Sequence, residues 1–302
     1  MLTKFRARYA LVAATVLLTS CATPIAAQNT LADKELRETS GIALSRLNNN
    51  QLWLLNDGNH PATLYALDTT GKALARLKVR GEKNRDWEDL ASFTWRDRHW
   101  LVVADIGDNS ANHKKSTLHF LEEPQLPARS KKLKLKPTFS IDFTYPDGPR
   151  DAESIAYDPL SEEILILSKR DRPAQLYSLP LAELSANPKA RHSAKLLGPL
   201  PWDGDVPRLS SLLLNPKRVV SHGMATGFDI SSDGLQAVIL GYQQAVLLRR
   251  DAGQTWMQAQ ITSLPPHRLE QAEAITINHD NRSVFITSEG KNAPLIQQAL
   301  PK

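Results

Sequence analysis

The stretch "WEDLASFTWRDRHWLVVADIGD", Trp87–Asp108, contains two apolar segments joined by a short polar turn. The first segment alternates small and apolar residues, which is typical of a β-strand with two different faces. The second is a continuous apolar run that ends in two aspartates and a glycine. The stretch therefore predicts two antiparallel strands that bring acidic side chains to the end where the first strand begins and the second one ends.

The same plan occurs four more times along the chain. The other first strands are "ETSGIALS" from Glu38, "AESIAYD" from Ala152, "ATGFDIS" from Ala225 and "AEAITIN" from Ala272. The anchor positions Glu38, Glu88, Glu153, Thr226 and Glu273 are 50, 65, 73 and 47 residues apart. A four-stranded propeller blade needs about 40 to 50 residues, so the two long intervals hold a blade and an additional loop. The sequence predicts an all-β fold, a five-bladed β-propeller, with six blades as the alternative.

The two ends of the chain are expected to meet in one blade. The last repeat ends near Leu300 after only three strands, and residues 30–37 precede the first repeat. We expect the N-terminal strand to complete the last blade and close the ring. Closure removes the sheet edges that would otherwise invite aggregation. The predicted propeller domain covers residues 30–302.

The first twenty residues predict export from the cytoplasm. Lys4, Arg6 and Arg8 precede a short apolar run, and "LTSC" ends at Cys21, the only cysteine of the chain. This layout resembles a bacterial lipoprotein signal, residues 1–20, followed by a lipidated Cys21 and a tether over residues 21–29. We expect a periplasmic protein with a lipid anchor, in the outer membrane because no aspartate follows Cys21. The alternative is a plain secretory signal that is cut after Ala27.

The charge balance gives no indication of a nucleic-acid partner. Removal of residues 1–20 takes away three of the 37 Lys and Arg residues, leaving 34 against 32 Asp and Glu. The densest basic run, "RSKKLKLK" from Arg129, alternates lysine with leucine and contains no aromatic residue. Nucleic-acid binding would favour aromatic side chains there. We expect no nucleic-acid partner and a monomeric protein.

Two positions in each repeat are expected to lie at the same rim of the propeller. Glu88 and Asp105 are 17 residues apart, three other pairs are 16 apart, and Glu38 and Asp57 are 19 apart. The predicted metal ligands at this rim are Glu38, Asp57, Glu88, Asp105, Glu153 and Glu273. The predicted ligand-binding residues beside them are Asp89, Asp108, Asn109, Lys169, Tyr242 and Glu289.

Carboxylates that converge on a narrow channel repel one another unless they bind protons or share a cation. Ca²⁺ is the expected cofactor, because it takes about 6–8 oxygen ligands in irregular geometry. In the alternative interpretation, each glutamate hydrogen-bonds the next blade and only ties the ring together. A small anionic or polyhydroxyl ligand could bind beside the metal through the lysine, tyrosine and serine groups of this rim.

The chain resembles single-domain bacterial propellers of the SdiA-regulated type. The resemblance rests on "ETSGIA", "LYALDTTGK" and "AESIAYD" and covers most of residues 36–300. It implies a five-bladed propeller with a calcium site near the channel, and a wider similarity extends to phytase-like, lactonase-like and NHL propellers. The resulting hypothesis is an envelope lipoprotein that binds a cation and a small ligand or an envelope protein. A metal-dependent hydrolase of a lactone or phosphoester is the alternative, and the sequence leaves open whether the protein is an enzyme.

Overall fold

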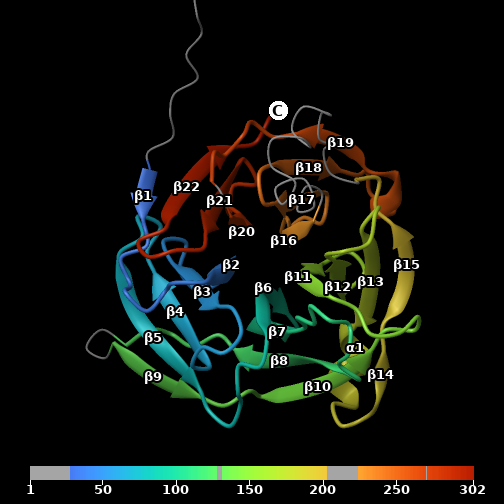
Figure 1. Ribbon diagram of the computed structural model, residues 1–302, viewed down its shortest axis with the longest axis horizontal. Coiled ribbons are helices and arrows are strands. Elements are labelled where there is room, and N and C mark those ends of the chain that lie inside the picture. Colours follow the sequence, from blue (N-terminus) through green and yellow to red (C-terminus); the bar gives the residue numbers. More distant parts are fainter. Residues whose placement is uncertain (1–27, 128–130, 203–223, 270) are drawn as a thin grey trace, which may run out of the picture.

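The computed structural model describes residues 28–127, 131–202, 224–269 and 271–302. These ranges form five β-sheets arranged in a ring around a common axis (Figure 1). The protein is therefore the five-bladed β-propeller that the repeats predict. The predicted signal and the lipidation site Cys21 lie outside the described residues.

Blades 1 and 2 contain five strands each. Blade 1 consists of β2 (Thr39–Leu44), β3 (Leu52–Asn56), β4 (Thr63–Leu67), β5 (Ala73–Val79) and β9 (Lys132–Leu135). Blade 2 consists of β6 (Trp87–Trp95), β7 (Arg98–Asp105), β8 (Ser116–Glu122), β10 (Phe139–Thr144) and β14 (His192–Ser193). The fifth strand of each blade pairs in parallel, β9 with β5 and β14 with β10.

The other three blades contain four strands each. Blade 3 consists of β11 (Ala152–Asp158), β12 (Glu163–Ser168), β13 (Gln175–Pro180) and β15 (Lys195–Pro199). Blade 4 consists of β16 (Ala225–Ile230), β17 (Gln236–Gly241), β18 (Ala245–Arg249) and β19 (Gln260–Ser263). Blade 5 consists of β20 (Ala272–Ile277), β21 (Ser283–Ser288), β22 (Pro294–Ala299) and β1 (Gln28–Thr30). A short helix α1 (Leu181–Ala186) and a 3-10 turn η1 (Trp256–Gln258) lie between strands.

The N-terminal strand closes the ring, as predicted. β1 pairs antiparallel with β22, so that Asn29 lies opposite Leu295. The strand covers Gln28–Thr30 and overlaps the expected segment, residues 30–37, at Thr30. Leu31 and Leu36 follow it and are buried in the hydrophobic cluster between blades 5 and 1. The N-terminus of the domain thus joins the first blade to the last.

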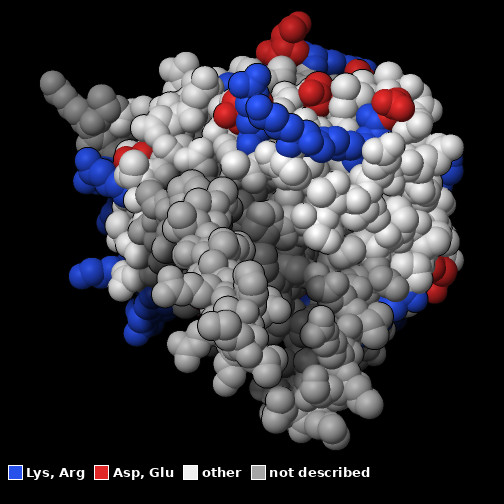
Figure 2. All heavy atoms as spheres, turned by 90° about the horizontal axis from the view of Figure 1, so that it is seen from above, with Lys and Arg blue, Asp and Glu red and all other residues white. Residues whose placement is uncertain are grey.

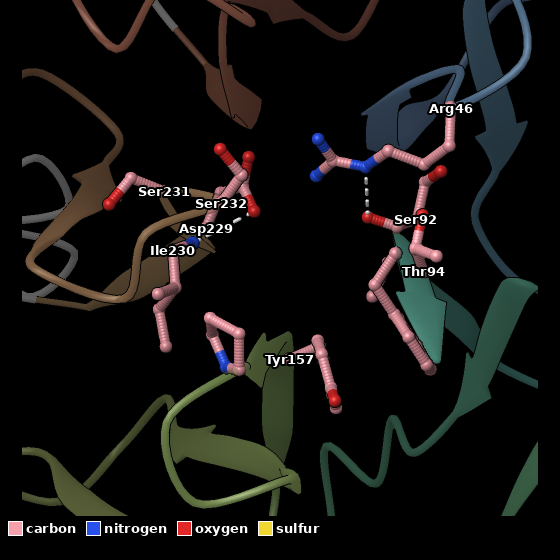
Figure 3. Close-up of a pocket in the computed structure, with 11 residues that line it drawn as sticks. Arg46, Ser92, Thr94, Tyr157, Asp229, Ile230, Ser231 and Ser232 are labelled. Atoms are coloured by element: carbon pink, nitrogen blue, oxygen red, sulfur yellow. Dashed lines mark hydrogen bonds between the residues drawn. The ribbon is translucent and has the colours of Figure 1, made fainter. Parts of the chain in front are cut away.

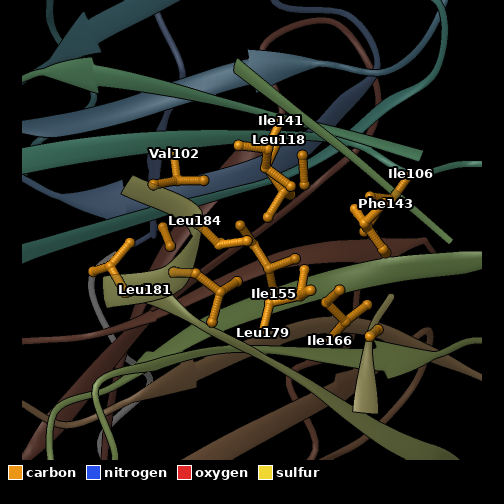
Figure 4. Close-up of a cluster of buried hydrophobic side chains, with 14 of the residues drawn as sticks. Val102, Ile106, Leu118, Ile141, Phe143, Ile155, Ile166, Leu179, Leu181 and Leu184 are labelled. Atoms are coloured by element: carbon orange, nitrogen blue, oxygen red, sulfur yellow. The ribbon is translucent and has the colours of Figure 1, made fainter. Parts of the chain in front are cut away.

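The inner strand of every blade is buried on both faces, because a neighbouring blade packs on each side of it. β2, for example, contacts both β6 of blade 2 and β20 of blade 5. Five hydrophobic clusters lie between consecutive blades, and Figure 4 shows the one between blades 2 and 3. This burial explains why the inner strands contain small and apolar residues on both faces. In the described ranges no helix is long and apolar enough to cross a membrane.

The outer surface carries charges of both signs. β9, the strand predicted to be basic and solvated, exposes Lys132 and Lys134 while Leu133 and Leu135 pack partly against the cluster between blades 1 and 2. On the side of the molecule seen in Figure 2, Lys and Arg side chains form a row along the upper edge with Asp and Glu side chains among them.

Candidate functional site

Each of the five inner strands contains a β-bulge at the same place, near its beginning. In blade 2, Trp87 lies opposite Asp105 and Asp89 lies opposite Ala104, so Glu88 is the additional residue. The other four inner strands show the same register shift against their second strands. A bulge bends a strand and turns one side chain out of the regular alternation, and bulges are frequent beside active sites. Here the five bulges select one side chain per blade at one end of the ring.

The bulge residues are Ser40, Glu88, Glu153, Thr226 and Glu273. Blade 1 therefore contributes Ser40 at this position, whereas the comparison of the five repeats in the sequence predicted Glu38. The side chain of Glu38 is 53% exposed and lies 3.4 Å from His60. Glu38 is structurally equivalent to Asp86, two residues before the bulge. With Ser40 as the anchor, the distance to Asp57 becomes 17 residues, in line with the other blades.

Three carboxylates meet where blades 1 and 2 adjoin. Asp57 follows β3, Asp86 precedes β6 and Glu88 is the bulge residue of β6. One oxygen from each carboxylate lies within 4.8 Å of the others. Two of the three, Asp57 and Glu88, are predicted metal ligands, and Asp86 was missed by the sequence analysis. The acidic mouth is defined here as Asp57, Asp86, Glu88, Glu153, Glu273 and Glu289.

Two glycines leave the space that these carboxylates occupy. A Cβ atom at Gly58 would lie 2.5 Å from the Asp86 carboxylate. A Cβ atom at Gly107 would overlap the carboxylates of both Glu88 and Asp86. Both contacts would be closer than the contacts that Cβ atoms make in real proteins. Neither position therefore tolerates a side chain while the carboxylates stay in place. The glycines of the "NDGN" and "DIGDN" turns are thus part of the cluster's geometry, in addition to their role in turns.

Burial and the neighbouring carboxylates disfavour the charged form of the carboxyl groups in this cluster. Burial, followed by the neighbouring Asp57, Asp105 and Asp151, raises the pKa of Asp86 to about 6. Burial also raises the pKa of Glu88 well above its usual value, with Asp57 and Asp86 as the nearest repelling groups. The pKa of Asp57 is raised as well, mainly by burial. At neutral pH a cation at this place would relieve both the repulsion and the loss of hydration.

Lys169 is a buried cation of the acidic mouth. It follows β12 and forms an ion pair with Glu153, the bulge residue of its own blade. Its ammonium lies 5.7 Å from the centre of the Tyr242 ring in blade 4. Attraction to Lys169 opposes the rise in the pKa values of Asp57, Glu88 and Glu273, which belong to three other blades. Lys169 therefore attracts predicted rim residues of several blades electrostatically.

Glu273 and Glu289 of blade 5 form a second carboxyl pair. Burial and then the neighbouring Glu289 raise the pKa of Glu273 to about 9. Glu289 accepts a hydrogen bond of 3.1 Å from the Gln271 amide, and burial raises its pKa too. Burial and the Glu273 carboxylate also raise the pKa of the Tyr242 phenol. At neutral pH Glu273 carries a proton and can donate a hydrogen bond.

Three predicted rim residues make contacts around the turn after β7, and Asp105 also contacts Asp86 of the acidic mouth. The carboxylate of Asp105 accepts hydrogen bonds from Arg85 at 3.0 Å and from the Asp86 backbone at 3.2 Å. Asp108 organises its own loop by accepting from the backbone of Asn112 and His113. Asn109 is exposed and accepts a hydrogen bond from Arg170. These side chains shape the turn after β7: both oxygens of Asp108, the Asn109 oxygen and one oxygen of Asp105 already accept hydrogen bonds.

The predicted role of Asp89 as a ligand-binding residue does not fit its position. Asp89 is 3% exposed, and its carboxylate accepts hydrogen bonds from the backbone of Leu90 and of Ile155 in blade 3. Two hydroxyls at bulge positions also link blades: Ser40 donates to Trp87 at 3.1 Å and Thr226 donates to Ala272 at 2.8 Å. Asp89 and these hydroxyls thus link neighbouring blades.

Asp86 could have been found in the sequence from a second repeat position. Asp86 stands two residues before Glu88, and Asp151 stands two residues before Glu153. Asp151, which was also missed, is buried and accepts hydrogen bonds from the Asp108 backbone and from Arg170. The signal was the repeated Asp-x-Glu spacing, which the displaced anchor in blade 1 concealed.

Comparisons with known proteins bear on the fold. No family model matches this chain, and no curated protein matches it. Among solved structures, the major allergen Mala s 1 of Malassezia sympodialis shares 12% identity at a TM-score of 0.54, covering 89% of this chain and 95% of that one. A gluconolactonase from Xanthomonas campestris shares 13% identity at a TM-score of 0.45, covering 87% of this chain and 72% of that one. At these identities the first likeness concerns the fold alone, and the second carries no argument. The likeness to Mala s 1 agrees with the fold described above, whereas the resemblance to the SdiA-regulated type stays a prediction.

The acidic mouth should make stability depend on pH above neutrality. Because burial and the neighbouring Glu289 raise the pKa of Glu273 to about 9 in the folded protein, well above the ordinary value of a glutamate, the folded state keeps a proton that the unfolded chain has released. Stability therefore falls as pH rises toward 9. We expect the melting temperature, measured in chelator, to decrease by a few degrees between pH 7 and pH 9. Histidines do not interfere, since unfolded histidine is already neutral in this range.

Glu273→Gln should remove much of this decrease, because glutamine resembles the protonated acid. The matched control is Glu122→Gln, whose carboxylate is 55% exposed in a surface pair with Arg98. The control should melt with the same pH dependence as the unchanged protein. A melting temperature that stays constant or rises from pH 7 to pH 9 would contradict the placement of Glu273 in a buried carboxyl pair.

Proposed function

We propose that the acidic mouth binds a divalent cation, with Ca²⁺ as the first choice, through Asp57, Asp86 and Glu88. The observation that carries the proposal is the approach of three carboxylates from two blades to within 4.8 Å. Two glycines clear the space around them, so the approach is a property of the fold and not of one flexible side chain. Repulsion among buried carboxylates costs stability, and a shared cation offsets that cost.

The donor set favours calcium over other metals. All three side chains offer oxygen, which hard cations prefer, and none offers the nitrogen or sulfur typical of zinc sites. Ca²⁺ also tolerates the irregular geometry that ligands from two blades and two turns impose, whereas Mg²⁺ requires a near-ideal octahedron. Backbone carbonyls and water would supply the remaining ligands, as they do in other calcium sites.

The groups around the cation fit a small polyhydroxyl ligand. Glu153 already neutralises Lys169, so the lysine offers little net attraction to an anion. The remaining groups are carboxyls and the Tyr242 phenol, which exchange hydrogen bonds with hydroxyl groups. A carboxylate-rich mouth disfavours anions that do not bind the metal directly. We therefore propose that the protein binds a polyhydroxyl ligand in a cation-dependent way. An envelope protein that offers hydroxyl groups is the other partner considered.

Cation binding should raise stability in a way that depends on the cluster. At a hundredfold excess over its dissociation constant, Ca²⁺ should stabilise the fold by roughly 2.7 kcal/mol. For a domain of this size the melting temperature should rise by roughly a few degrees. Asp86→Asn and Glu88→Gln should each weaken binding by tenfold or more in calorimetric titration with Ca²⁺.

Glu38→Gln serves as the matched control for these variants. Glu38 was a predicted ligand, but its side chain is 53% exposed and lies outside the three-carboxylate cluster. This variant should bind Ca²⁺ within twofold of the unchanged protein. Equal loss of binding in Glu38→Gln and Glu88→Gln would show that the cation is held by general negative charge, and no binding in any form would reject the proposal.

A hydrolase is the second candidate function, and one observation favours it. The pKa of Asp86 is raised to about 6, so near neutrality this carboxylate can take a proton from water beside a bound cation. A cation at the cluster would polarise the ester bond of a lactone or phosphoester and activate that water. In this reading Asp86 is the general base and Glu88 holds the metal.

A turnover assay separates the two candidates. Purified protein is mixed with a panel of lactones and phosphoesters, with Ca²⁺ or with chelator. The hydrolase predicts calcium-dependent turnover that falls at least a hundredfold in Asp86→Asn. Calcium binding without turnover on the whole panel favours the binding protein.

We also propose that Cys21 carries a lipid anchor that holds the propeller on the periplasmic side of the outer membrane. The support is the layout of residues 1–21 and the resemblance to propellers of the SdiA-regulated type. Cys21→Ser should release a soluble or unprocessed form, detected by fractionation of cells and by the mass of the mature N-terminus. A mature protein that begins after Ala27 and carries no lipid would contradict the anchor.

A further inference from the structure

A pocket lies at the other end of the ring from the acidic mouth. Its volume is about 100 Å³. It is lined by residues near the ends of four inner strands, including Arg46 after β2, Thr94 of β6, Tyr157 of β11 and Ile230 of β16. The bulges stand at the beginnings of the same strands, so this far-end pocket is separate from the acidic mouth.

Arg46 supplies the positive charge of the far-end pocket. Its Nε donates a hydrogen bond of 3.0 Å to the backbone oxygen of Ser92, which fixes the side chain along the wall. Figure 3 shows the two terminal nitrogens of Arg46 pointing across the pocket toward the strand that carries Asp229. In the part of the chain that the structure describes, no carboxylate forms an ion pair with the Arg46 side chain. The guanidinium therefore presents donors to the pocket.

Asp229 stands on the opposite wall, but its oxygens are already used. Oδ1 accepts from the Ile230 backbone, and Oδ2 accepts from the Thr276 hydroxyl and the Ile277 backbone, each at 2.8 Å. These bonds tie blade 4 to blade 5, as Asp89 ties blade 2 to blade 3. Asp229 thus keeps its place without help from Arg46, and its carboxylate adds a negative field to one wall.

The remaining walls are largely apolar and include an aromatic pair. The rings of Phe93 and Tyr157 are stacked with centres 4.0 Å apart and planes at 18°. Pro159 and Ile230 extend this apolar wall. Ser92 also lines the pocket, is only 7% exposed, and its hydroxyl makes no hydrogen bond within the described residues.

We propose that the far-end pocket binds a small organic monocarboxylate with a flat apolar body. The Arg46 fork matches a carboxylate with two parallel hydrogen bonds, which gives both strength and orientation. The apolar body would lie against Tyr157 and Pro159. The field of Asp229 disfavours a dianion such as phosphate. This assignment does not depend on the cation site at the acidic mouth.

Calorimetric titration with benzoate tests the assignment, with benzamide as the uncharged ligand of nearly the same shape. The unchanged protein should bind benzoate saturably, and at least tenfold more tightly than benzamide or inorganic phosphate. Arg46→Gln should lower the affinity for benzoate tenfold or more. Arg98→Gln is the matched control, because Arg98 is exposed and pairs with Glu122 outside the pocket. This control should leave binding unchanged.

A second variant tests the pocket independently of whether Arg46→Gln folds. Ser232 is exposed at the pocket and holds no described hydrogen bond to another blade, so Ser232→Tyr should fold normally and obstruct the pocket. Loss of benzoate binding in Ser232→Tyr, with an unchanged melting temperature, supports the site. Equal affinity for benzoate and benzamide, unchanged binding in Ser232→Tyr, or absence of saturable binding in the unchanged protein would overturn it.

Discussion

Burial of the inner strands on both faces is the constraint on which the rest of this propeller depends. Each inner strand lies between two blades, so polar groups at its ends must find partners within the ring. The Asp89 carboxylate of blade 2 accepts a backbone hydrogen bond from the inner strand of blade 3. The Asp229 carboxylate of blade 4 accepts one from the inner strand of blade 5. The glutamates at the bulges do not, because a bulge turns their side chains out of the ladder. At the bulges, the hydroxyls of Ser40 and Thr226 still link blades, whereas the glutamates of the other three blades are left to act at the acidic mouth.

The two ends of the ring have opposite chemical character as a result. At the acidic mouth, burial raises the pKa values of five carboxyls, and Lys169 forms an ion pair with the sixth, Glu153. At the far end, an arginine faces an aspartate whose oxygens are already bonded. The first arrangement suits a cation and hydroxyl groups, and the second suits a small carboxylate. A propeller can hold two such sites because the inner strands keep their ends apart.

The fold could be predicted from the sequence because it depends on repeated strand patterns. The five repeats, the closing strand and the rim positions of Asp57, Lys169, Tyr242 and Glu289 all follow from counting residues along extended strands. The cluster itself could not be predicted fully. A bulge shifts the register by one residue, and no propensity marks it, so Glu38 was aligned where Ser40 stands. Asp86 and the far-end pocket depend on contacts between blades, which a strand pattern does not contain.

We propose that Asp57, Asp86 and Glu88 together hold one divalent cation. A crystal structure of the protein grown with Mn²⁺ in place of Ca²⁺, with anomalous difference density used to locate the metal, tests this proposal. We expect one strong peak bonded to oxygens of all three carboxylates, beside Gly107 and absent in crystals of Glu88→Gln. A peak bonded to Glu273 and Glu289 instead, or a cluster that contains only water in saturating metal, would contradict it.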